Sequence, residues 1–280
     1  QRQMCIRDSM LSIAEKKLAN IDVTKDNNFK NFIKRRPLGV VFVIAPWNYP
    51  YMTAINTIAP ALIAGNVVAL KHATQTLLVG ERLVDAFISV GIPKDVFINM
   101  YLDHETTSRL IEENSFDFVN FTGSLRGGIE MERAAAGTFT PVGTELGGKD
   151  PGYVMEDADL DAAVETLIDG AMYNSGQCCC GIERIYVVES LYEKFLQKAI
   201  NIVENYKLGN PLEPETTIGP MANKRFSDEV RLQINEAVEL GATAHIEVFK
   251  NDEAGTYVTP QILTGVDHNM RIMKDETYGP

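Results

Sequence analysis

The chain has 280 residues, of which 45% are hydrophobic and 23% charged, and its formal net charge is −12. This composition is typical of a globular protein, and the length suits one large domain or two ordinary ones. Nucleic acids and anionic membranes need a positively charged face, and the tightest basic cluster here is only Lys34–Arg36. We therefore expect neither as a partner.

The N-terminal sequence QRQMCIRDSM has no apolar segment like that of a signal peptide and no clear periodicity. We expect residues 1–10 to be foreign to the fold, as a tag would be. The four cysteines, three of them adjacent, do not have the spacing of a disulfide framework. A reducing, cytoplasmic compartment is the expected location.

Residues 37–70 carry no charge, but proline, glycine and asparagine interrupt them repeatedly. No apolar run reaches the roughly 20 residues that a membrane-spanning helix needs. The pattern predicts a strand at 39–45, a helix at 52–64 and a strand at 66–72. The first strand, GVVFVIA, is a continuous apolar run rich in β-branched residues, which is typical of burial on both faces.

Helices and strands continue to alternate up to residue 146, which predicts βαβ units in a doubly wound, Rossmann-like parallel sheet. The next helix has an apolar stripe and ends at Gly91. The residues of this stripe are Leu78, Val79, Leu83, Val84, Phe87 and Ile88. The expected helices lie at 76–91, near 106–114 and after the strand at 116–121, the last of them ending at about residue 136. The expected strands lie near 96–101, at 116–121 and near 140–146.

A glycine pair at 147–148 separates this region from a second α/β run, so we expect a domain boundary there. The second run contains predicted strands at 150–155 and 182–188 and predicted helices at 158–176, 191–206 and 224–242. Ser190 and Glu193 have the spacing of a capping box. The chain stops at MKDETYGP without a closing element, so we expect the second domain to be incomplete.

Residues 174–184 read NSGQCCCGIER. Adjacent cysteines rarely bridge each other, and three in a row cannot all face one metal ion, so we expect no metal site. Cys178 and Cys180 are interpreted as small packing residues. Cys179 is the candidate nucleophile, which would need local positive potential or hydrogen-bond donors.

Six motifs occur in order: APWNYP, LKHATQT, FTGS, TELGGKDP, NSGQCCC and DETYGP. Together they resemble the NAD(P)-dependent aldehyde dehydrogenase superfamily from about Arg35 to Pro280. The resemblance implies a nucleotide-binding domain at 1–146, followed by a catalytic domain at 147–280 that is truncated at its C-terminus. It also implies a small-molecule aldehyde substrate, and a homodimer or homotetramer when the protein is complete. A chain that at most binds nucleotide without turnover is the alternative.

By the same resemblance, Cys179 adds to the aldehyde carbon and forms a thiohemiacetal, and later a thioester. The side chain of Asn48 and the backbone N–H of Cys179 would stabilise the oxyanion. Glu145 would activate the water that hydrolyses the thioester. From the residues alone, Asn48 could be only a turn residue, and Glu145 only a solvated carboxylate. Members that transfer the acyl group to coenzyme A lack this glutamate, so a free acid is the expected product.

The resemblance implies NAD or NADP as cofactor. FTGSLRGG follows a predicted strand and opens a helix, so its N–H groups could meet a pyrophosphate. Lys71 would hold the adenosine ribose, although it could simply end a strand, and Glu276 would hold the nicotinamide ribose. Thr74 stands where NAD-preferring members commonly have glutamate, which favours acceptance of NADP. Tyr278 stands where the family usually has phenylalanine. The other implied cofactor contacts are Ile44, Pro46, Trp47, Gly123, Ser124, Gly128 and Leu146.

Overall fold

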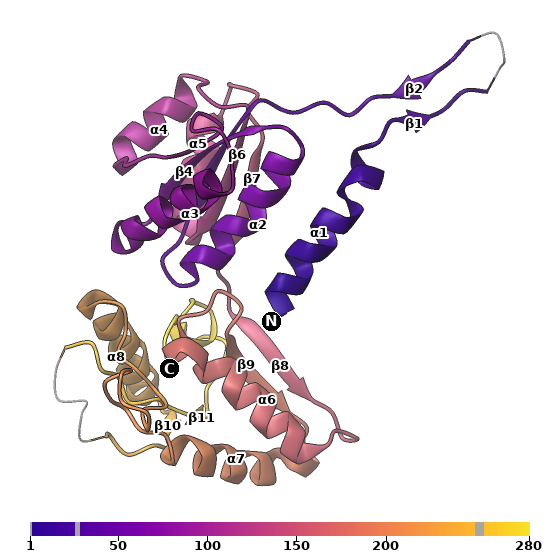
Figure 1. Ribbon diagram of the computed structural model, residues 1–280. Helices are drawn as coiled ribbons and strands as arrows, with labels where there is room; N and C mark the ends of the chain where they lie inside the picture. Colours follow the sequence, from indigo (N-terminus) through magenta and orange to yellow (C-terminus); the bar gives the residue numbers. More distant parts are fainter. Residues whose placement is uncertain (1, 26–28, 250–254) are drawn as a thin grey trace. The chain divides into compact units, whose positions relative to one another are not determined.

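The computed structural model describes residues 2–25, 29–249 and 255–280 (Figure 1). The chain folds as two compact units, Gln1–Leu146 (unit 1) and Gly147–Pro280 (unit 2). The division falls at the glycine pair where the sequence changes from one α/β run to the next.

A five-stranded parallel sheet with the order β5-β4-β3-β6-β7 forms the centre of unit 1. Its strands are β3 (Val40–Ala45), β4 (Val67–His72), β5 (Phe97–Asn99), β6 (Phe118–Gly123) and β7 (Val142–Leu146). The chain runs outward from β3 to β5, then returns to the other side of β3 and continues through β6 to β7. This is the predicted doubly wound order, and it places a topological switch point between β3 and β6.

Helices cover both faces of this sheet, as Figure 1 shows. They are α2 (Pro50–Ile63), α3 (Leu77–Ser89), α4 (His104–Glu112) and α5 (Leu125–Ala135), with the short 3₁₀ helix η1 (Thr74–Thr76). Along β3, Val41 and Val43 pack in the cluster with α2 and α3, whereas Phe42 and Ile44 pack in the cluster with α4 and α5. The prediction that this strand is buried on both faces is therefore confirmed.

The uncharged stretch at 37–70 contains β3, α2 and β4. Pro50 occupies the first helical position of α2, where its fixed φ favours helix and its missing N–H costs nothing. Among the described residues, no helix is both long and apolar enough to cross a membrane. On α3, the predicted stripe is correct except at Leu78, whose side chain is 58% exposed.

The N-terminal segment differs from the expectation of a foreign tail. Residues Arg2–Leu18 form helix α1, which contacts α2, and the strands β1 (Ile21–Asp22) and β2 (Phe32–Ile33) pair in antiparallel fashion. Residues 8–18 are mostly exposed. Since this part of the helix has no buried face, it has no need for an apolar stripe, and its sequence shows no helical periodicity.

Unit 2 is built around a parallel pair of strands, β8 (Asp150–Val154) and β9 (Ile182–Val187), with α6 (Leu160–Met172) and α7 (Glu189–Glu204) packed beside them. Helix α8 (Lys224–Glu239), the antiparallel pair β10 (Thr243–Ala244) and β11 (Leu263–Thr264), and the 3₁₀ helices η2 (Tyr173–Gly176) and η3 (Arg271–Met273) complete it. Its largest hydrophobic cluster joins α6, α7 and the end of β8 through Ile168, Phe195 and Val154.

Two predictions about the helices of unit 2 are wrong. The helix expected at 158–176 stops at Met172, because Asn174 and Ser175 adopt left-handed conformations with φ of 54° and 56°. The capping box at Ser190 does not form, since α7 begins at Glu189 and its N-cap makes no side-chain hydrogen bond. The N–H of Val188 donates to the Val154 carbonyl at 3.2 Å. The hydrogen bonds between β8 and β9 therefore continue up to the residue before α7.

Candidate functional site

The carboxyl ends of adjacent parallel strands bring most of the predicted cofactor residues of unit 1 to one edge of the sheet. Ile44, near the end of β3, is in register with Lys71 on β4 and with Phe121 on β6. Gly123 at the end of β6 is in register with Leu146 at the end of β7. In open α/β sheets, ligands bind at this edge, beside the switch point.

The turn between β6 and α5 presents a helix N-terminus at this edge. Ser124 is the N-cap of α5, and its Oγ accepts the Gly127 N–H at 3.2 Å. The N-terminal end of a helix carries partial positive charge and unsatisfied N–H groups, which suit a phosphate. Gly128 allows α5 to approach β7, because a Cβ there would lie 2.8 Å from Leu146 Cδ2. Leu146 thus packs beneath the first turn of α5.

Lys71 is a buried ammonium group at the end of β4, with 5% of its surface exposed. Burial lowers the pKa of Lys71, and the negative charge of Asp103 opposes this effect. Asp103 is the N-cap of α4 and accepts the Thr106 N–H at 2.7 Å. The sequence reading missed Asp103, although an aspartate followed by HETT at a helix start is a typical N-cap signal. Thr74, three residues beyond Lys71, is exposed.

The remaining predicted residues of unit 1 lie on β3, on β7 and in the loop between β3 and α2. Ile44 is buried within the sheet, whereas Trp47 and Asn48 are half-buried in the loop, as is Pro46. Glu145 lies on β7 in register with Thr122, and its side chain is exposed.

In unit 2, Cys179 lies in a tightly held loop between η2 and β9. The side chain of Gln177 accepts the Ala222 N–H at 2.7 Å and donates to the Asn174 carbonyl at 3.1 Å. The hydroxyl of Ser175 donates to the Gly219 carbonyl at 2.9 Å. A left-handed serine costs about 1 kcal/mol or more and persists only where its surroundings fix it, which is common at functional sites.

The surroundings of Cys179 favour its neutral thiol. Burial is the main cause that raises the pKa of Cys179, and the neighbouring Cys178 and Glu276 add to it. The Cys179 side chain is half-buried, and the structure contains Cys178, Cys179 and Cys180 as free cysteines. Cys180 is exposed, so its interpretation as a packing residue is wrong. A nucleophilic role for Cys179 requires a base or a positive charge that favours the thiolate.

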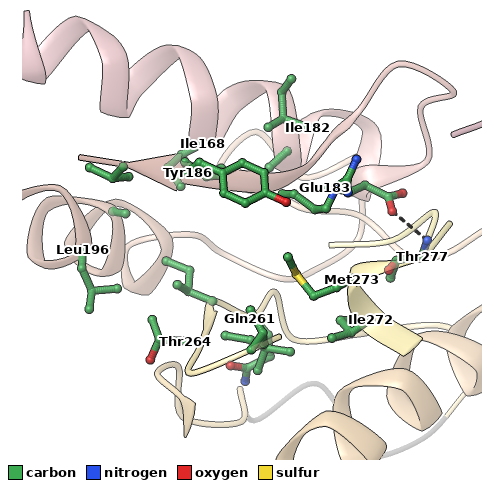
Figure 2. Close-up of a pocket in the computed structure, with 18 of the residues that line it drawn as sticks. Ile168, Ile182, Glu183, Tyr186, Leu196, Gln261, Thr264, Ile272, Met273 and Thr277 are labelled. Carbon is green, nitrogen blue, oxygen red and sulfur yellow. Dashed lines mark hydrogen bonds between the residues drawn. The ribbon is translucent and has the colours of Figure 1, made fainter. Parts of the chain in front are cut away.

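A buried polar network holds the segment that contains Glu276 and Tyr278. The Glu183 carboxylate accepts the N–H groups of Thr277 at 2.8 Å and Tyr278 at 2.9 Å (Figure 2 shows the first of these). Lys149 Nζ lies 2.7 Å from Glu183 Oε2 and donates to Thr277 Oγ1 at 2.6 Å. Thr277 in turn donates to Gln233 Oε1 at 2.7 Å. These bonds support the left-handed φ of 56° at Tyr278.

The Glu276 carboxyl is close to the backbone of residues 147–148 and contributes to the electrostatics of Cys179. Burial, followed by repulsion from Glu183, raises the pKa of Glu276 to about 7. A Cβ at Gly147 would lie 1.9 Å from Glu276 Oε1, so a larger residue there would displace the carboxylate from this position. A Cβ at Gly176 would lie 2.2 Å from the Gly279 carbonyl carbon, so the same segment also packs against the cysteine loop.

A largely apolar cavity of about 590 Å³ lies within unit 2 (Figure 2), and Lys149, Glu183 and Thr277 of the polar network are among the residues that line it. Ile168, Ile182, Leu196 and Ile272 are among the residues that line it. Tyr186, which also lines it, is hydrogen-bonded through its hydroxyl to His268 Nε2 at 2.9 Å. Across the described ranges, no group of three or more His, Cys, Asp or Glu residues is arranged to hold a metal ion.

Comparison with known proteins gives a consistent result. The sequence model of the aldehyde dehydrogenase family matches residues 6–280. The match therefore begins well before Arg35 and includes residues 6–10, which were expected to be foreign.

Two curated relatives illustrate the range of similar sequences. The chain is 33% identical over 269 residues to succinate-semialdehyde dehydrogenase [NADP(+)] of Mycobacterium avium (strain 104), covering 95% of this chain and 57% of the relative. It is 38% identical over 248 residues to a 4,4'-diapolycopene aldehyde oxidase of a Methylomonas species, covering 89% of this chain and 46% of the relative. The chain thus spans about half the length of these relatives.

Solved structures agree with the sequence comparison. An NAD+ complex of aldehyde dehydrogenase from Bacillus cereus superposes with a TM-score of 0.91 at 31% identity, over 98% of this chain and 56% of that one. Succinate-semialdehyde dehydrogenase from Burkholderia pseudomallei superposes with a TM-score of 0.91 at 30% identity, over 98% of this chain and 57% of that one.

Proposed function

The chain belongs to the aldehyde dehydrogenase family, and from this premise we propose that it oxidises an aldehyde to the carboxylic acid with NAD or NADP. The observation that carries the proposal is the loop in unit 2, where a half-buried thiol, Cys179, follows two left-handed residues and is affected by the charge of Glu276.

Cys179 is the proposed nucleophile. Its thiolate adds to the aldehyde carbon, so that a C–S bond forms and the carbonyl oxygen becomes an oxyanion. Because burial raises the pKa of Cys179, the thiol must lose its proton to a base or to solvent as the substrate binds. The Asn48 amide and the Cys179 backbone N–H are the proposed donors to the oxyanion, where preorganised donors stabilise developing charge.

Loss of hydride from the carbon of this adduct, for which a bound nicotinamide would be the acceptor, would leave a thioester, and hydrolysis of this thioester is assigned to Glu145. Its carboxylate would accept a proton from water as the water attacks the acyl carbon, and the thiolate of Cys179 would leave. The exposed side chain of Glu145 supports access to water. We propose the free acid as product rather than an acyl-coenzyme A.

The donor groups at the carboxyl edge of unit 1 fit a nicotinamide dinucleotide. The N-terminus of α5 suits a pyrophosphate, and the buried ammonium of Lys71 suits the hydroxyls of a ribose. Pro46 and Trp47 would pack against the cofactor, Glu276 would hold the second ribose, and Tyr278 would lie beside it. When bound, the cofactor supplies a hydride acceptor, and the protein supplies orientation.

NADP is proposed as an accepted cofactor because Thr74 is neutral and exposed. A glutamate at this position would repel a 2′-phosphate, whereas a hydroxyl would not. The relative from Mycobacterium avium is named for NADP(+), which supports this assignment. The aldehyde itself is left general, since the two relatives are named for a small acidic aldehyde and for a long apolar one. Homodimeric or homotetrameric assembly and a cytoplasmic location stay predictions.

The test is to incubate the 280-residue chain with NADP and aldehydes of both kinds, and to measure reduced nucleotide and product together. The proposal predicts one carboxylic acid for each nucleotide reduced. Acyl transfer to added coenzyme A would refute the role of Glu145. Nucleotide binding without any reduction would favour the alternative of a chain that binds but does not turn over.

A further inference from the structure

The two cysteines that flank Cys179 lie against each other. Cys178 Sγ and Cys180 Sγ are 3.4 Å apart, which is hydrogen-bonding distance for two sulfur atoms. A turn brings them together, closed by the Gly181 N–H and the Cys178 carbonyl at 3.0 Å. The proposed mechanism uses neither thiol.

We propose that Cys178 and Cys180 form a reversible disulfide when the protein meets a peroxide, and that Cys179 remains a free thiol between them. A disulfide has an S–S bond of about 2.05 Å, so the two sulfur atoms must approach by little more than 1 Å. Rotation of two side chains on one turn can supply this movement. The pair is also accessible, because Cys180 is exposed and Cys178 is half-buried.

The position of the shared proton sets the order of the reaction. The contact with Cys178 is the main cause that raises the pKa of Cys180 to about 11, so the proton stays on Cys180. Cys178 is then the sulfur that attacks the nearer oxygen of hydrogen peroxide. The O–O bond breaks, hydroxide leaves and takes up a proton as water, and Cys178 becomes a sulfenic acid.

The second step closes the bond. The Cys180 sulfur attacks the Cys178 sulfenic acid, the S–O bond breaks, and a second water leaves with the proton of Cys180. In total, the two thiols lose two electrons and two protons, and the peroxide is reduced to two waters. A small-molecule dithiol reverses the change by thiol–disulfide exchange. The consequence is that oxidant is consumed beside Cys179 while its thiol is kept.

The experiment uses the 280-residue chain in a Cys5→Ser background, which leaves only the three adjacent cysteines. The background, Cys178→Ser, Cys179→Ser and Cys180→Ser proteins are treated with hydrogen peroxide and alkylated. The masses of the intact protein and of its fragments then give the rate at which the disulfide forms, as a loss of two hydrogen atoms. They also show whether dithiothreitol restores these two hydrogen atoms. Because aldehyde oxidation is not measured, the result does not depend on the proposed function.

We expect the background and Cys179→Ser proteins to form the bond at rates within about twofold of each other, and Cys178→Ser and Cys180→Ser to form it at least about tenfold more slowly. Alkylated Cys179 in the oxidised background would support the assignment. Retention of the reversible bond in Cys178→Ser or Cys180→Ser, or its loss in Cys179→Ser, would overturn it because Cys179 would then be a partner. Oxidation of all three thiols to sulfinic acid with no reversible bond would also overturn it.

Discussion

Replacement of Lys149 by methionine tests the buried network that holds residues 276–278. Methionine keeps the length and apolar stem of lysine but removes the ammonium group. In the native protein this group contacts Glu183 at 2.7 Å and Thr277 Oγ1 at 2.6 Å. The side chains of Lys149 and Glu183 are only 6% and 9% exposed, so water cannot replace the lost partner easily.

The magnitude follows from what remains around Glu183. Removing one partner of a buried ion pair typically costs about 3–5 kcal/mol, because it leaves the other charge uncompensated. Here the N–H groups of Thr277 and Tyr278 still bond to the carboxylate, which offsets part of the loss. Burial also lowers the pKa of Lys149, so its removal relieves a desolvation cost. We therefore expect Lys149→Met to lower the free energy of unfolding by about 3 kcal/mol.

Urea denaturation followed by far-ultraviolet circular dichroism measures this change. The matched control is Lys198→Met, which breaks the ion pair with Asp161, whose side chains are 47% and 80% exposed. Exposed pairs contribute less than about 1 kcal/mol. If Lys149→Met lowers stability no more than Lys198→Met does, the reasoning about the buried network is wrong.

Two further predictions concern Glu276 and Thr74. The pKa of Glu276 is raised from an ordinary 4.5 to about 7 in the folded protein. Between pH 4.5 and about 7, the folded protein therefore keeps a proton on Glu276 that the unfolded chain has lost. The free energy of unfolding of the native protein, relative to that of Glu276→Gln, should therefore fall as pH rises from 4.5 to about 7. Urea denaturation midpoints of both proteins at several pH values measure this. A difference between the two proteins that does not change with pH would contradict the prediction. Thr74→Glu should weaken NADP binding by about tenfold or more through charge repulsion and leave NAD binding nearly unchanged, as titration with each nucleotide would measure. Equal effects on both nucleotides would contradict the role of Thr74.

The sheet of unit 1 could be predicted because its strands and helices have strong apolar patterns. Residues 39–45 read as a strand buried on both faces, and Val41 and Phe42 do pack on opposite faces. Helix α1 could not be predicted, since residues 8–18 are mostly exposed and follow no apolar stripe. The early end of α6 depends on left-handed residues 174 and 175, neither of which is glycine.

The candidate site was only partly predictable. Cys179 and Glu276 were assigned by the resemblance of their motifs to those of the family, and their roles stay predictions. The network of Lys149, Glu183 and Thr277 was missed because it joins residues 34 and 128 positions apart, which no local pattern reveals. The exposure of Cys180 was missed for a similar reason, since it depends on how the turn after Cys178 is oriented.

Of the three adjacent thiols, only Cys179 is proposed to act in aldehyde oxidation. The most direct test measures aldehyde-dependent reduction of NADP by the chain and by its Cys178→Ala, Cys179→Ala and Cys180→Ala variants. We expect Cys179→Ala to abolish the reaction, whereas the two flanking variants should retain most of it. Activity that survives in Cys179→Ala, or equal losses in all three variants, would contradict the claim.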